Sequence, residues 1–321
     1  MGVVGLLRVF GAERDRRMAH SHGSLMMEDM HYSATGPAKV PRKLCLIIND
    51  ASGSYSEEAV DALRADLADA GLTVARCITC PDQDLPEPAE LDADDIDCVA
   101  VFAGDGTISG TVKSLSGWGG AVLPLPGGTM NLLCHRLHGE AEAGDIVRTL
   151  ADGKAKLVCP PIIRSDEGQS LVSISAGPGV QWYHVRETMR DGSLGELLNE
   201  SSDAVDHTLN GPQVLCRQPR LGRSEGYPLI ELVPLDREDG IRIVGYTADT
   251  IGGYIRQGFA IATRHFRDGP HEVLGHAERI VLANAQGEQL QLSFDGEPTC
   301  GAAEVEFAVD RCPVKLIAVK A

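Results

Sequence analysis

The sequence predicts a parallel α/β unit followed by a β-rich unit. Between about residues 41 and 157, short apolar runs alternate with stretches of helical periodicity, which indicates right-handed crossovers and a parallel sheet. From residue 158 to 321 the segments are mostly short and alternate polar with apolar side chains, which favours antiparallel β structure. A chain of 321 residues is long enough for two domains. Residues 1–40 lack sustained periodicity, so we expect a disordered leader there.

The elements of the first unit follow from local patterns. The apolar run 44–48 is typical of a strand buried on both faces. Ser54 and Glu57 have capping-box spacing and begin a helix that we expect to end at Gly71. Further strands are expected at 72–78, 96–102 and 121–125. The stretch 81–95 is rich in Pro, Asp and Glu and is expected to be a surface excursion.

Composition excludes several classes of protein. With 29 Lys and Arg against 46 Asp and Glu, the net charge of −17 disfavours binding to nucleic acid through phosphate contacts. Nine irregularly spaced Cys do not form a disulfide framework, and we expect reduced thiols in a cytoplasmic protein. No apolar run reaches the ~18 residues of a membrane span. The leader is apolar and then Arg-rich, the reverse of a secretory signal, and whether it touches a membrane stays open.

Three glycine-bearing loops follow three of the expected strands. They are Asn49 to Gly53, Ala103 to Thr107, and Pro126 to Asn131. Glycine lets backbone N–H groups approach an anion, and a helix that begins at such a loop adds a partial positive charge. Neither a P-loop nor the dinucleotide fingerprint is present. Because the carboxyl ends of parallel strands share one sheet edge, we expect these loops to form one phosphate-binding site. Asp105 could instead be a turn aspartate that bonds to its own backbone.

These loops resemble the diacylglycerol kinase catalytic-domain family, in its bacterial lipid kinase and sphingosine–ceramide kinase branch. Gly104-Asp105-Gly106-Thr107 resembles the GGDGT signature, and Asn49 with Ser52 and Gly53 resembles the NPxSG loop. Gly128 to Asn131 resembles the GTxN segment. Asp295-Gly296-Glu297-Pro298 resembles the DGE motif of the second domain, and Asp239-Gly240 resembles an earlier DG turn. The motifs occur in family order over roughly residues 42–321.

The resemblance implies a Rossmann-like nucleotide-binding domain, a β-sandwich lipid-substrate domain and an active site between them. We leave open that the last strand returns to the first domain. The implied activity is ATP- and Mg²⁺-dependent phosphorylation of a lipid hydroxyl of the diacylglycerol, sphingoid or ceramide type at a membrane surface. Glu297 would accept the proton, with Asp295 as its neighbour. The residues implied to bind the nucleotide are Asn49, Ser52, Gly53, Thr79, Ala103, Gly104, Asp105, Gly106, Thr107, Ser109, Gly128, Thr129 and Asn131.

Magnesium ligands are also implied. In bacterial members that the chain resembles, a magnesium site lies around the DG turn, which here maps onto Asp236, Asp239 and the Ile241 carbonyl. Asp105 is our candidate to hold the magnesium ion that accompanies ATP. The sequence departs from the family pattern in three places. Ala103 replaces the first glycine of GGDGT, Asp50 replaces a proline, and Ser109-Gly110 replace an Asn-Glu pair, which removes a carboxylate.

Two other functions stay open. An NAD kinase shares GDGT, but the DGE motif suits the lipid branch. A non-catalytic nucleotide-binding protein on a degenerate kinase scaffold would account for Ala103 and Gly110. Two arginine clusters could face anionic membrane headgroups or simply be solvated; they are Arg217, Arg220 and Arg223, and Arg256, Arg264 and Arg267. The sequence identifies neither the lipid nor the oligomeric state, and a homodimer is left open.

Overall fold

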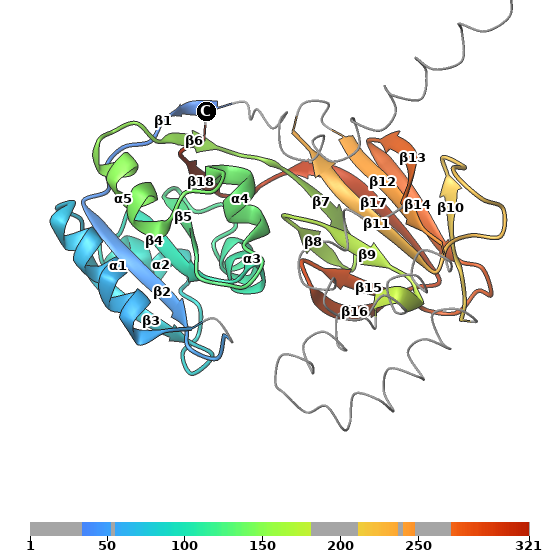
Figure 1. Cartoon of the computed structure of the whole chain (residues 1–321), viewed down its shortest axis with the longest axis horizontal. Helices are drawn as coiled ribbons and strands as arrows, with labels where there is room; N and C mark the ends of the chain where they lie inside the picture. The colour runs from blue at the N-terminus through green and yellow to red at the C-terminus, as the bar shows by residue number, and fades with distance from the viewer. Residues whose placement is uncertain (1–33, 53–54, 181–210, 237–239, 248–270, 321) are drawn as a thin grey trace, which may run out of the picture.

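The protein consists of an α/β domain beside a β domain (Figure 1). The computed structural model describes residues 34–52, 55–180, 211–236, 240–247 and 271–320. The α/β domain contains a seven-stranded sheet, and the β domain contains two antiparallel sheets of five and six strands. The predicted fold class is therefore confirmed.

The seven-stranded sheet has the order β1-β6-β18-β5-β4-β2-β3. Its strands are β1 (Ala34–Pro37), β2 (Lys43–Asn49), β3 (Thr73–Cys80), β4 (Cys98–Ala103), β5 (Ala121–Pro126), β6 (Lys156–Val158) and β18 (Lys315–Ala318). The pairs among β3, β2, β4, β5 and β18 are parallel, whereas β6 and β1 add antiparallel pairs at the other side. The last strand thus lies inside the first sheet, between β5 and β6.

One part of the expected leader is ordered. Residues 34–37 form β1, which pairs with β6 at the edge of the sheet. Thr35 also donates a hydrogen bond from its Oγ1 to the Leu157 carbonyl at 3.0 Å. Our assignment of residues 34–40 to a disordered leader is wrong, because a four-residue edge strand needs no long apolar run to pair. Residues 1–33 lie outside the described part of the chain.

Helices cover both faces of the seven-stranded sheet (Figure 1). On one face lie α1 (Glu57–Asp69) and α5 (Ala143–Ala151). On the other lie α2 (Pro88–Ala93), α3 (Asp105–Ser114) and α4 (Leu132–His138). The helix α2 falls in the stretch that we expected to be a plain surface excursion. That expectation is wrong because the fully buried Leu91 anchors a short helix within an otherwise polar segment.

The start of α1 also differs from our prediction. The N-cap is Ser56, whose Oγ accepts a hydrogen bond from the N–H of Ala59 at 3.3 Å. Ser54 lies outside the described residues, and Glu57 is the first helical residue. The end is as expected. Gly71 follows the helix with φ of +72°, and its N–H donates to the Ala68 carbonyl.

The β domain is a sandwich of two antiparallel sheets. The five-stranded sheet contains β10 (Val214–Gln218), β14 (Arg279–Asn284), β17 (Glu304–Arg311), β7 (Pro161–Ser165) and β8 (Gly168–Ser170), in that order. The six-stranded sheet contains β13 (Glu272–Ala277), β12 (Gly240–Tyr246), β11 (Leu229–Leu235), β9 (Ile174–Ala176), β15 (Leu290–Phe294) and β16 (Glu297–Gly301), in that order. A short 3₁₀ helix, η1 (Pro178–Val180), follows β9. Buried side chains such as Ile174, Leu232 and Phe307 form the core of this domain.

The two domains share a hydrophobic cluster. Leu133 and Leu137 of α4 belong to the same buried cluster as Ile162, Leu171 and Val172 from the β domain. Each of these side chains is at most 8% exposed. Because an apolar interface resists sliding and hinge motion, this cluster fixes the β domain against α3 and α4.

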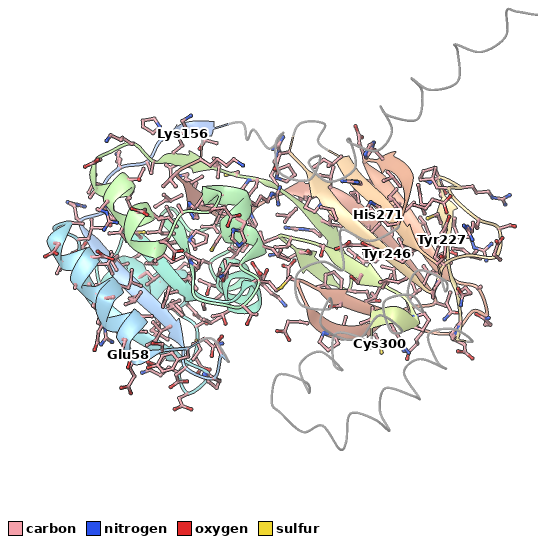
Figure 2. All side chains as sticks on the ribbon, in the orientation of Figure 1. Glu58, Lys156, Tyr227, Tyr246, His271 and Cys300 are labelled. Atoms are coloured by element: carbon pink, nitrogen blue, oxygen red, sulfur yellow. The ribbon has the colours of Figure 1, made fainter. Side chains whose placement is uncertain are left out.

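Two expectations concern membranes. Within the part of the chain that the structure describes, no helix has the length and hydrophobicity needed to span a bilayer. The first arginine cluster lies near Tyr227, whose hydroxyl accepts a hydrogen bond from the Arg223 N–H at 3.2 Å, on the side of the β domain away from the α/β domain (Figure 2). Arg223 also pairs with Glu272 at 3.3 Å. Arg256, Arg264 and Arg267 lie outside the described residues.

Candidate active site

The three glycine loops meet at the carboxyl edge of the parallel strands. Asn49, the last residue of β2, donates from Nδ2 to Oγ1 of Thr107 at 2.9 Å, which joins the first loop to the second. Its Oδ1 accepts from the N–H of Ala51 at 3.0 Å. The Gly127 N–H donates to the Ala103 carbonyl at 3.3 Å, which joins the third loop to the second. The loops therefore form one connected edge, as the alternating strands predict.

Glycine is sterically required where the second and third loops touch. A Cβ atom on Gly127 would lie 2.6 Å from the backbone nitrogen of Ala103 and 2.6 Å from the Phe102 carbonyl carbon. A Cβ on Gly128 would overlap the Cα of Gly104. The close approach brings the backbones of two loops to one place, and anion-binding loops use glycine for such close backbone approach.

Asp105 links the starts of two helices. It is the first residue of α3, and its two carboxylate oxygens accept the N–H groups of Leu132 and Leu133, each at 2.9 Å. These N–H groups belong to the first turn of α4, which has no intrahelical partner for them. Asp105 therefore caps α4 and joins the second glycine loop to the start of that helix.

Other predicted binding residues shape the same loops. The Asn131 side chain closes the third loop, because its Oδ1 accepts from the Gly128 N–H at 2.7 Å and its Nδ2 donates to the Gly128 carbonyl at 2.8 Å. Asn131 itself has φ of +50°, a conformation that asparagine tolerates well. Thr129 is exposed in this loop. Thr79 pairs with Ile48 at the carboxyl end of β3, beside the first loop.

Asp295 clamps a loop of the β domain. Its Oδ1 accepts from Ser170 Oγ and from the N–H groups of Val172 at 2.8 Å and Ser173 at 3.1 Å. Its Oδ2 accepts from the Leu171 N–H at 2.9 Å and from Ser109 Oγ. Both oxygens are thus fully occupied, and Ser109 belongs to α3 of the other domain. The Asp295 carboxylate fixes the turn between β15 and β16 against the α/β domain.

Glu297 reaches the glycine loops from the β domain. It is the first residue of β16 and is exposed. A Cβ atom on Gly106 would lie 2.7 Å from Oε1 of Glu297, so the carboxylate lies directly against the second loop. A larger residue at position 106 would require the Glu297 side chain to move away. The structure therefore brings the proposed proton acceptor from one domain to the proposed phosphate-binding loop of the other.

A cavity opens beside the third loop. It has a volume of about 320 Å³ and lies between α1, α5 and the end of β5, with Phe102, Gly127 and Gly128 in its wall. Asp66 and Glu142 also line it. Because two carboxylates repel a triphosphate, we do not assign the phosphates to this cavity.

One family model matches the first domain. Residues 43–159 match the model of the diacylglycerol kinase catalytic domain, to which this part of the chain is therefore similar. A diacylglycerol kinase structure from Bacillus anthracis str. Sterne is 12% identical, with a TM-score of 0.54, and the match covers 88% of this chain and 98% of that one. Another protein from that organism, provisionally described as a diacylglycerol kinase, is 13% identical with a TM-score of 0.56 and coverages of 88% and 96%. No curated protein matches the sequence.

The predicted magnesium site beyond the catalytic domain does not fit its residues. Asp236, at the end of β11, forms a buried ion pair with Arg136 of α4. A fixed cation therefore already neutralises this carboxylate. Asp239 lies outside the described residues, as does Gly53 of the first loop, and Ile241 is buried in β12. Over the described ranges, no group of three or more His, Cys, Asp or Glu side chains could hold a metal ion. The assignment of Asp236 as a metal ligand stays a prediction, although its carboxylate already has Arg136 as a partner.

Sequence reasoning missed the residues that join the two domains. Ser170 and the backbone of residues 171–173 hold Asp295, yet no motif marks them. Arg136 could have been noticed, because it lies three residues after Leu133 on the apolar face of α4. A charged side chain on a buried helix face needs an oppositely charged or polar partner. Arg136 on the apolar face of α4 therefore indicated a buried partner elsewhere in the chain.

Proposed function

We propose that the protein is a lipid kinase that transfers the γ-phosphoryl group of ATP to the hydroxyl of a lipid alcohol of the diacylglycerol, sphingoid or ceramide type. The observation that supports it most is the position of the Glu297 carboxylate against Gly106. A kinase needs a phosphate-binding loop and a proton acceptor at one point, and these two groups come from different domains. The match of residues 43–159 to a kinase family supports the same reaction.

Each residue has a defined task in this proposal. Phosphoryl transfer to an alcohol has a loose transition state, so catalysis depends on positioning and charge neutralisation. Backbone N–H groups of the three loops bind the phosphates, and Asp105 is our candidate ligand for the magnesium ion that enters with ATP. Glu297 accepts the proton of the lipid hydroxyl. Asp295 positions Glu297 and does not react, because its oxygens are already occupied.

A transfer assay tests the proposal. Purified full-length protein is incubated with radiolabelled ATP and Mg²⁺, with a panel of lipid alcohols in mixed micelles and with NAD in parallel. We expect label in a lipid alcohol. Label in NAD alone would contradict the proposal and favour an NAD kinase. ATP binding without turnover on any acceptor would favour a non-catalytic scaffold.

A matched pair of variants tests the role of Glu297. Glu297→Gln removes the proton acceptor, and we expect kcat to fall by about 10²–10⁴-fold with the melting temperature unchanged. Glu304→Gln is the control, because Glu304 is also an exposed glutamate at the start of a β-domain strand. Equal kcat values for the two variants would show that Glu297 is not the proton acceptor.

A further inference from the structure

The pair of Arg136 and Asp236, hereafter the junction pair, is the feature that the proposed chemistry leaves unexplained. The Arg136 side chain is 6% exposed and the Asp236 side chain 1%. Nε of Arg136 lies 3.3 Å from Oδ2 of Asp236, and its NH2 group donates to Oδ1. Burying two charges is costly, so such a pair persists only where its geometry is well satisfied.

Arg136 also donates to two backbone carbonyls. NH1 donates to the Leu171 carbonyl at 2.6 Å, and NH2 donates to the Pro161 carbonyl at 3.1 Å. The guanidinium is therefore enclosed by one carboxylate and two backbone carbonyls. Carboxylate and carbonyl oxygens are also the ligands that hard divalent cations prefer. Here these oxygens bind the planar guanidinium of an arginine.

The junction pair connects both halves of the site. Arg136 belongs to α4, whose first turn is held by the Asp105 carboxylate of the second glycine loop. Its partner Leu171 belongs to the loop that clamps Asp295, and Asp295 fixes the turn that carries Glu297. Hydrogen bonds and short backbone segments thus connect the phosphate-binding loop, through Arg136 and Asp295, to the turn that carries Glu297.

We propose that Arg136 is the fixed cation of the domain junction, paired with Asp236, a residue to which the family resemblance assigns a magnesium ion. Its guanidinium ties α4 to three segments of the β domain, so the junction is held together without a metal. Arg136 is on this account a positioning residue for Glu297. The positioning part rests on the proposed kinase function, whereas the metal-independent junction does not.

The first test uses the unaltered, nucleotide-free protein. Its melting temperature is measured after chelation with EDTA and again in 10 mM MgCl₂. We expect the two melting temperatures to agree within about 1 °C. A magnesium ion that bound only the folded state would raise the melting temperature at this concentration. A fall of several degrees on chelation would overturn the proposal, because a metal would then hold the junction.

Variants test the guanidinium itself. Arg136→Met leaves Asp236 buried without its cation, and we expect a loss in melting temperature on the order of 10 °C. The double variant Arg136→Met with Asp236→Leu removes both charges and should recover most of that loss. In Arg136→Ala, millimolar guanidinium ion should raise the melting temperature, whereas Arg136→Met has no space for it. An Arg136→Met protein as stable as the wild type would contradict the proposal.

The positioning role has its own readout. With Arg136→Lys, which keeps the positive charge but not the planar fork, we expect kcat to fall about tenfold while the dissociation constant of ATP is unchanged, because Asp105 still holds α4. In Arg136→Ala, guanidinium should restore kcat and stability together. A loss of ATP affinity without a loss of kcat would overturn the positioning role. If the wild type transfers no phosphate at all, the proposed function is wrong. The melting temperatures then still test whether Arg136, without a metal, holds the junction.

Discussion

Substituting Gly127 by alanine tests whether the close contact between two loops is needed. The new Cβ would lie 2.6 Å from the Ala103 nitrogen, whereas ordinary contacts begin at 3.4 Å. The backbones must therefore separate by roughly 0.8 Å, and overpacking of this kind costs about 1–3 kcal/mol. Neither backbone can rotate away as a side-chain end could. A displacement of about 1 Å among positioned groups also lowers catalytic efficiency, by up to about 10²-fold.

Gly104→Ala is the matched control for this substitution. A Cβ on Gly104 would lie 3.7 Å from the Gly128 Cα, an ordinary contact, and φ of −78° at Gly104 suits any residue. Urea unfolding of the nucleotide-free proteins measures both effects. We expect Gly104→Ala within about 0.5 kcal/mol of the wild type. If Gly127→Ala unfolds at the same urea concentration as Gly104→Ala, the loops are not held in the contact that we describe.

Two more predictions concern buried polar groups. Burial lowers the pKa of His138 to about 4 from its ordinary 6.5, so between these pH values the unfolded chain binds a proton that the folded chain does not. The free energy of unfolding should therefore fall by about 3 kcal/mol as the pH decreases through this window, and urea titrations should show a smaller decrease for His138→Asn. Asp295→Asn places an amide donor against backbone N–H donors, and we expect a loss of about 3 kcal/mol together with a loss of kcat. A kcat loss with unchanged stability would assign Asp295 a chemical role instead.

Local sequence patterns predicted the strands of the α/β domain and the loops that follow them. The run 44–48 lies inside β2, which is buried along its middle five residues, and each glycine loop follows the strand that we expected. These predictions succeed because burial on both faces leaves an unbroken apolar signal. The helix α2 escaped prediction because Leu91 is its one buried side chain, and one residue gives no periodicity.

Contacts between distant segments were beyond a single sequence. Asp295 was placed beside Glu297 by a motif, but its partners Ser170 and Ser109 lie 125 and 186 residues away in the chain. The pairing of Arg136 with Asp236 spans 100 residues. Such pairs depend on how the two domains meet, which periodicity and turn signals do not encode. Asp236 was therefore interpreted as a magnesium ligand without knowledge of the arginine that pairs with it.

The position of β18 has a consequence for synthesis of the chain on the ribosome. This strand lies between β5 and β6, so the first sheet keeps an open edge at β5 until residues 315–318 emerge. The whole β domain is translated before that edge is filled, and unpaired edges promote aggregation. A nascent chain halted near residue 160 would therefore be a natural client for chaperones, and expressing the first 160 residues alone should yield an insoluble product.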